Sequence, residues 1–151
     1  MNLISYDLTS ADNLLSFAFY SEGPKGRIKK IIQFRKLIVP DSQNDIYNLA
    51  FGDLNEKENK IDDLIVSDNK DSEKVLATIG SAVVLFTSAY PSTLIFAQGS
   101  TSSRTRYYTI GISKYFKEID SFFEIWGFSD RDEWELYQKN TAYKALLVRR
   151  K

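Results

Sequence analysis

The sequence predicts an α+β domain with a mainly antiparallel sheet and two helices packed on one face. Two observations carry this prediction. Apolar side chains alternate with the period of a strand through much of the first 66 residues, and then recur at spacings of three and four, the period of a helix, over residues 75–90. Strands that come in a run before the helices are typical of α+β folds. The length of 151 residues fits one domain, residues 1–151.

The first half of the chain predicts strands joined by polar turns. Phe17 and Phe19 fall on one face of the first strand, and the turn residues after it predict a hairpin with the next strand. Tyr47, Leu49 and Phe51 alternate in a third strand. The expected strands span residues 15–21, 27–39, 46–53 and, with the weakest pattern of the four, 61–66.

The second half predicts two helices and three strands, in the order helix, strand, helix, strand, strand. Asp71 or Ser72 can cap the first helix, and Pro91 ends it at Tyr90. A short apolar strand, expected at the centre of the sheet, separates the two helices. After the first helix, the elements are expected at residues 93–98, 100–118, 122–128 and 143–150.

The composition excludes several kinds of chemistry. The chain has no histidine and no cysteine, which removes disulfides, thiolate nucleophiles, Cys/His zinc sites and every histidine-based acid–base pair. Its 20 basic and 20 acidic residues cancel, so no overall charge draws it to nucleic acid or to an anionic membrane. No signal-peptide pattern opens the sequence and no apolar run is long enough to span a bilayer, so we expect a cytoplasmic protein.

The segment after the expected strand at 93–98 is the richest candidate site. Gly99 lets the backbone approach a ligand, and the residues after it open a helix whose N-terminus offers free N–H groups and a positive dipole end. Hydroxyls and guanidinium groups supply donors that match phosphate oxygens. The residues expected to bind phosphate are Gly99, Ser100, Thr101, Ser102 and Ser103, and the catalytic candidates are Arg104, Arg106, Tyr107 and Tyr108.

A purely structural role for this segment stays open. Ser100 or Thr101 can serve simply as the helix N-cap, with both arginines in surface salt bridges. Against this, Arg104 shares the core-facing stripe of the helix with Tyr108, so its charge must be paired or face a ligand. Arg106 is rotated by roughly 200° from Arg104, so the two cannot grip one anion as helical neighbours unless the helix begins late.

The first hairpin is a second candidate, because Lys25, Arg27 and Lys29 make it basic. Arg27 and Lys29 share one strand face with Ile31, whereas Lys30 falls on the other face. The functional interpretation is a track for a phosphodiester backbone that leads toward the helix site. The alternative is a charged edge that protects the sheet from aggregation.

Acidic and aromatic residues give two weaker candidates. Asp53, Asp62 and Asp63 carry the oxygen ligands that a divalent ion prefers, but their spacing fits no EF-hand and a solvated acidic loop is favoured. No metal site is therefore assigned. Among the aromatic residues, Trp134 lies amid acids in an expected loop, where it either anchors a partner or joins the core with Trp126.

Three motifs are spread along the chain: SEGPKG at residues 21–26, YNLAFGD at 47–53, and GSTSSRTR at 99–106 together with ISK at 112–114. Together with the basic tail at 147–151, they resemble a small bacterial domain family of about this length whose function is uncharacterised. The resemblance implies family membership and no particular activity. Size and class suggest a toxin–antitoxin system.

The enzymatic hypothesis is a metal-independent and cofactor-free ribonuclease of toxin type. Arg104 and Arg106 would stabilise the scissile phosphate, and Tyr107 or Tyr108 would carry a proton or stack on a base. The hairpin cations would guide the RNA backbone.

The alternative hypothesis is a module that binds and does not cut. It is either an RNA or nucleotide sensor that uses the same helix N-terminus, or an antitoxin-like partner of a small cognate protein. In the second case the acidic segments 53–63 and 129–135 would contact a basic partner. A plain oligomer-forming domain would instead use the aromatic surface around Trp126 and Trp134.

Overall fold

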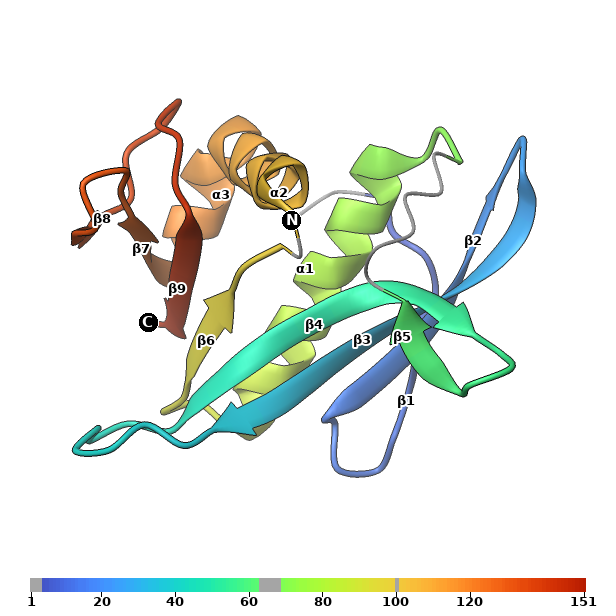
Figure 1. Cartoon of the computed structure of the whole chain (residues 1–151), viewed down its shortest axis with the longest axis horizontal. Helices are drawn as coiled ribbons and strands as arrows, with labels where there is room; N and C mark the ends of the chain where they lie inside the picture. Colours follow the sequence, from blue (N-terminus) through green and yellow to red (C-terminus); the bar gives the residue numbers. More distant parts are fainter. Residues whose placement is uncertain (1–3, 63–68, 100) are drawn as a thin grey trace. The chain divides into compact units, whose positions relative to one another are not determined.

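The computed structural model describes residues 4–62, 69–99 and 101–151 of the chain. In this part of the chain, nine strands form a mostly antiparallel sheet and three segments are helical, which confirms the α+β class (Figure 1). None of the helices in the described residues is long and apolar enough to cross a membrane. The strands are β1 Thr9–Ser10, β2 Ser16–Gly23, β3 Gly26–Leu37, β4 Ile46–Asn55, β5 Lys60–Asp62, β6 Leu94–Ala97, β7 Phe123–Phe128, β8 Trp134–Leu136 and β9 Ala145–Arg150, and the helices are α1 Ser72–Ala89, α2 Ser102–Lys114 and α3 Phe116–Asp120.

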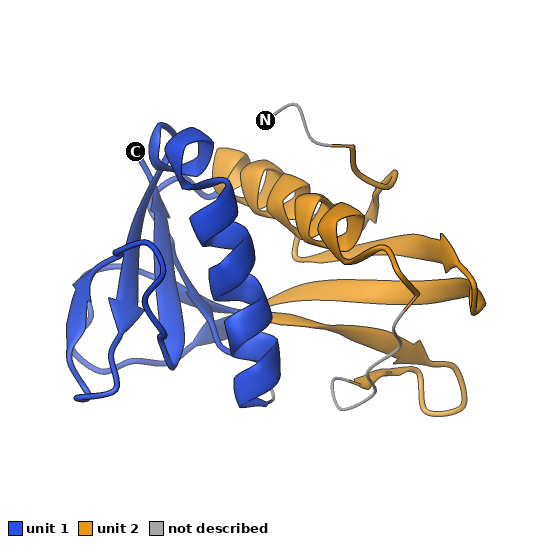
Figure 2. Cartoon of the chain, turned by 90° about the horizontal axis from the view of Figure 1, so that it is seen from above, with its two compact units in different colours: residues 1, 35–49, 90–151 blue, residues 2–34, 50–89 orange. Residues whose placement is uncertain are grey.

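The chain divides into two compact units (Figure 2). Unit 1 contains residues 35–49 and 90–151, and unit 2 contains residues 2–34 and 50–89. Strands β3 and β4 each contribute residues to both units. The expectation of one domain over the whole chain stays a prediction.

Unit 2 is built on the predicted hairpin and the first helix. Strands β2 and β3 pair antiparallel from Ser16 opposite Gln33 to Gly23 opposite Gly26, and Gly26 takes the positive φ of 89° that the turn needs. The alternate residues of both strands are buried on one face, as the period of two predicts. Helix α1 packs on this face, where Phe86 stacks on Phe34 with ring centroids 4.1 Å apart.

Two strands of unit 2 differ from the prediction. The two-residue strand β1 pairs with β2 and was not predicted, because two residues are too few to show a period. Strand β5 begins at Lys60, one residue before the expected start, and pairs with the end of β4. The rest of the expected strand at 61–66 lies outside the described residues.

Unit 1 holds a sheet in the order β4-β6-β9-β7-β8. Strand β6 lies between β4 and β9, as its apolar sequence predicts, and it runs parallel to β4 and antiparallel to β9. Strand β9 enters between β6 and β7, so the last strand of the sequence is an inner strand of the sheet. Residues of β6 and β7 alternate between buried and half-buried positions, which shows that one face of this sheet is more open than the other.

The prediction of one continuous helix over residues 100–118 is wrong. Helix α2 ends at Lys114, and a separate five-residue helix, α3, begins at Phe116. No glycine or proline marks this break in the sequence. In the structure the ring of Phe116 stacks on Tyr137 with centroids 5.4 Å apart, a tertiary contact that local periodicity does not reveal.

The prediction of a loop around Trp134 is also wrong. Residues 134–136 form strand β8, which pairs antiparallel with β7. A strand of three residues is shorter than the window in which alternation is recognisable, and the acidic residues around it disfavour a strand assignment.

Candidate functional site

The N-terminus of α2 is capped by the protein itself. Thr101 is the N-cap, with its side-chain oxygen accepting a hydrogen bond from the backbone N–H of Arg104 at 3.2 Å. The carbonyl of Thr101 also accepts a bond from the backbone N–H of Thr105. Of the two candidate caps, Ser100 lies outside the described residues. The structural role proposed for Thr101 is therefore confirmed.

Gly99 packs closely against the first turn of α2. Its N–H donates to the side-chain oxygen of Thr105 at 2.9 Å. A Cβ at this position would lie 2.5 Å from the backbone nitrogen of Thr105 and 2.6 Å from Cβ of Arg104. The residue must therefore be glycine for a contact within the protein, whether or not a ligand also approaches it.

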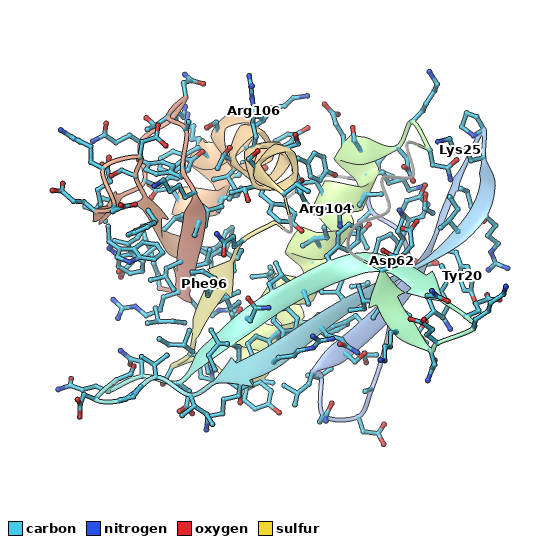
Figure 3. All side chains as sticks on the ribbon, viewed as in Figure 1. Tyr20, Lys25, Asp62, Phe96, Arg104 and Arg106 are labelled. Atoms are coloured by element: carbon cyan, nitrogen blue, oxygen red, sulfur yellow. The ribbon has the colours of Figure 1, made fainter. Side chains whose placement is uncertain are left out.

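The other residues of this segment face several directions. Ser102, Ser103 and Arg106 are exposed, Arg104 and Tyr107 are half-buried, and Tyr108 is buried. Figure 3 shows Arg104 and Arg106 projecting from α2 in different directions, in keeping with the rotation expected along a helix. The two arginines are thus placed to act separately and not as one clamp.

The basic hairpin lies in unit 2, whereas the α2 segment lies in unit 1. On the hairpin, Lys25 and Arg27 are exposed, and the guanidinium carbon of Arg27 lies 3.9 Å from the ring centroid of Tyr20. Lys29 is half-buried and lies 5.9 Å from the same ring. Arg27 also lies 3.9 Å from the carboxylate of Glu22. The hairpin therefore presents a ring flanked by cations.

The predicted acidic residues do not gather into an ion site within the described residues. Asp53 is buried and forms an ion pair with Lys30, and Asp62 lies opposite Asp53 in the β4–β5 register. Asp63 lies outside the described residues. In the part of the chain that the structure covers, no group of three or more acidic side chains lies close enough to hold a metal ion.

The open face of the unit 1 sheet carries a continuous set of large apolar side chains. We call it the aromatic face. Trp134 lies opposite Phe128, with ring centroids 5.0 Å apart, and its ring meets that of Phe96 in an edge-to-face arrangement with centroids 6.4 Å apart. Strand register adds the remaining members. The aromatic face consists of Phe96, Trp126, Phe128, Trp134, Leu136 and Leu147.

Part of the aromatic face is strongly exposed. Trp134 is 44% exposed and Leu136 is 67% exposed. Sequence reasoning identified Trp126 and Trp134 as candidates but missed Phe96 and Leu136, whose position beside them depends on strand order. Both tryptophans of the chain belong to this face.

Charged residues border the aromatic face. Arg149 bonds Glu124 at 2.8 Å and lies 5.3 Å from the ring of Trp126. Lys144 bonds Asp132 at 2.6 Å, and this hydrogen bond raises the pKa of the lysine. The turn that precedes β8 is closed by the Ser129 N–H, which donates to the Glu133 carbonyl at 2.8 Å. An apolar centre with a charged border is typical of a protein–protein interface.

Tyr137 follows β8 on the buried side and links it to α2. Its hydroxyl donates to the carbonyl of Thr109 at 2.8 Å and lies 2.5 Å from the hydroxyl oxygen of Ser113. Burial raises the pKa of Tyr137, with a smaller contribution from Tyr143 in the same direction, while the hydrogen bond with Ser113 lowers it.

Replacing Tyr137 with phenylalanine is expected to change how stability depends on pH. Unfolded tyrosine ionises near pH 10 while the folded residue keeps its proton, so stability falls as pH rises above about 10, by up to about 1.4 kcal/mol per pH unit for such a group. At pH 7 the variant should have a free energy of unfolding about 1 kcal/mol lower, because it lacks the hydrogen bond of the hydroxyl. Above pH 10 its free energy of unfolding should fall less steeply than that of the wild-type protein. Urea unfolding between pH 7 and 11 measures both effects, and parallel curves for the two proteins would contradict the assignment.

No curated protein and no solved structure matches this chain. A family model described as a family of unknown function, DUF6934, matches residues 2–151. The expected membership of an uncharacterised family of about this length is therefore confirmed, and the chain belongs to DUF6934, a family of unknown function.

Proposed function

We propose that this chain is a protein-interaction module that binds its partner through the aromatic face of unit 1. The observation that carries the proposal is the position of both tryptophans on one open sheet face, next to a leucine that is 67% exposed. Large apolar side chains gathered on a surface are uncommon in monomeric proteins and mark interaction sites. Tryptophan is also enriched among the residues that dominate binding energy.

Charge supports a protein partner at this face over a nucleic acid. Residues 130–135 contain four acids, Asp130, Asp132, Glu133 and Glu135, against the single base Arg131. Asp130, Asp132 and Glu133 lie in the turn that leads into Trp134, so a phosphate backbone laid along the aromatic rings would come close to carboxylates, and like charges repel. The border cation Arg149 is already bonded to Glu124.

Substitution of Trp134 with serine tests the proposal. The tagged chain is cross-linked to its neighbours in its own cells and recovered with them. We expect discrete partner proteins, and we expect the amount recovered to fall at least tenfold in the Trp134→Ser and Leu136→Ser variants. The matched control is Ile110→Ser, which removes another exposed apolar side chain, 58% exposed, from α2. Circular dichroism checks that all variants fold. Equal capture by all four proteins would overturn the proposal.

Nucleic-acid binding is a second candidate, and the cations of the hairpin and α2 favour it. Lys25, Arg27 and Arg106 are exposed, and a tyrosine ring flanked by cations suits stacking on a base. The capped N-terminus of α2 adds the positive end of a helix dipole. In this proposal Arg104 and Arg106 contact phosphate groups. If the protein also cuts the RNA, it is a ribonuclease of toxin type in which Tyr107 carries the proton.

Binding of a fluorescein-labelled single-stranded RNA tests each basic segment separately. Fluorescence polarisation at several salt concentrations is expected to show weaker binding for Arg27→Ala and for Arg104→Ala, with the slope of log K against log salt shallower by about 0.7 for each phosphate that the variant no longer neutralises. Lys57→Ala, in the exposed turn after β4, is the control. The same RNA on a denaturing gel tests for cleavage. Equal losses of affinity for all three variants would show that binding is non-specific.

A further inference from the structure

Among the described residues, no strand pairs with the outer edge of β8, so this edge can accept an additional strand. Strand β8 ends the strand order of the sheet. Its ladder with β7 is bracketed by two hydrogen bonds, from the Ser129 N–H to the Glu133 carbonyl at 2.8 Å and from the Tyr137 N–H to the Ile125 carbonyl at 2.9 Å. Hydrogen-bonded pairs alternate along an antiparallel ladder, so the next such pair between these two is Glu135 with Gly127.

The backbone groups of Trp134 and Leu136 therefore point away from β7. These two residues form the non-hydrogen-bonded pairs with Phe128 and Trp126, and so each turns its N–H and carbonyl to the outer edge. Edge groups of this kind are the template that an extended peptide uses when it adds a strand to a sheet. The same two residues place the most exposed side chains of the aromatic face beside that edge.

We infer that the partner contributes an extended segment in which lysine or arginine alternates with apolar residues, and that this segment adds to β8 as a further strand. The inference depends on the proposed interaction function and names the partner's chemistry. Alternate side chains of the added strand lie beside Trp134 and Leu136 and extend the aromatic face. The intervening side chains lie on the face of Glu135, whose carboxylate accepts a bond from the Tyr143 hydroxyl at 3.0 Å.

Charge selects this partner over a second copy of the chain. Edge-to-edge pairing of two β8 strands would bring two copies of the acids at 130–135 together, and like charges opposite each other destabilise a strand pair. A basic strand instead brings its cations to the side of β8 that carries Glu133 and Glu135, with opposite charge. Electrostatic complementarity of this kind sets partner choice and register.

The test uses the full chain and a synthetic seven-residue peptide that alternates lysine and valine, with both ends blocked. Because both tryptophans belong to the aromatic face, their fluorescence reports binding without a label. We expect a saturable change in emission that weakens with salt. A peptide with glutamate in place of lysine should bind at least tenfold more weakly, and so should the basic peptide with alternate backbone amides N-methylated.

Two variants of Leu136 separate the backbone edge from the side chain. Leu136→Pro removes the outward N–H at a position where an edge strand tolerates proline, and Leu136→Ala removes a similar amount of apolar surface but keeps the N–H. We expect Leu136→Pro to bind the peptide at least fivefold more weakly than Leu136→Ala. The N-methylated peptide supplies the same comparison with unaltered protein if the proline variant does not fold.

Three other outcomes of these experiments would each overturn part or all of the inference. Equal binding of the N-methylated and unmodified peptides would overturn strand addition and leave the interaction function standing. A dimer in light scattering that Trp134→Ser dissociates would replace the basic partner with a second copy. Fluorescence changes with single-stranded RNA and with neither peptide would overturn both the inference and the proposed interaction function.

Discussion

Replacing Lys30 with methionine is expected to lower the free energy of unfolding by about 3–5 kcal/mol. Lys30 and Asp53 are 6% and 8% exposed, and their charged atoms lie 2.5 Å apart. Removal of the lysine takes away the ammonium group that pairs with the buried Asp53 carboxylate, and a buried charge that loses an ion-pair partner is costly. Urea denaturation of the wild-type and variant proteins measures the difference.

Two further variants test the cause of this loss. Lys29→Met changes the neighbouring lysine, which lies on the opposite face of β3, and should alter stability by less than about 1 kcal/mol. The double variant with Lys30→Met and Asp53→Leu removes both charges and should recover most of the loss, because an apolar pair of similar volume avoids the desolvation cost. A double variant no more stable than Lys30→Met would show that packing, and not charge, explains the effect.

Replacing Phe86 with alanine is expected to lower the free energy of unfolding by about 3–5 kcal/mol as well. Phe86 is fully buried, and its ring stacks on Phe34 of β3. Truncation leaves a cavity between α1 and the sheet of unit 2, and neighbouring side chains do not fill this cavity because a packed interior relaxes only in part.

The adjacent residue supplies a matched control for this prediction. Leu85 is on the same helix but is 45% exposed, so Leu85→Ala should cost less than about 1 kcal/mol in urea denaturation. Equal losses of stability for the two variants would mean that helix propensity or a general weakening of α1, and not the buried ring, sets the stability of unit 2.

Long periodic elements could be predicted from the sequence because their signal is local. The alternation in β2, β3 and β4 places the buried residues correctly, and it puts Lys30 on the same face as Ile32. The partner of Lys30 could not be predicted. Asp53 is 23 positions further along the chain. The sequence suggested an ion ligand, a solvated loop residue or a contact to a basic partner, because an ion pair between separate strands leaves no local signal.

The residues of the aromatic face could also be predicted only in part from the sequence. Trp126 and Trp134 are conspicuous in the sequence as the only two tryptophans. The approach of Trp134 to Phe96 depends on the strand order β6-β9-β7-β8, which no local pattern encodes. The edge of β8 was missed for a related reason, since three residues form a strand there only with the support of β7.

The place of β9 also bears on how a nascent chain acquires unit 1. A ribosome makes β6 and β7 before β9, yet both pair with β9 in the finished sheet. Until β9 emerges, the two earlier strands carry open edges and their apolar side chains lack cover, the condition in which chains mispair or aggregate. Newly made chains are therefore expected to need chaperone protection longest in unit 1, whereas the β2–β3 hairpin of unit 2 pairs neighbouring segments as soon as they are synthesised.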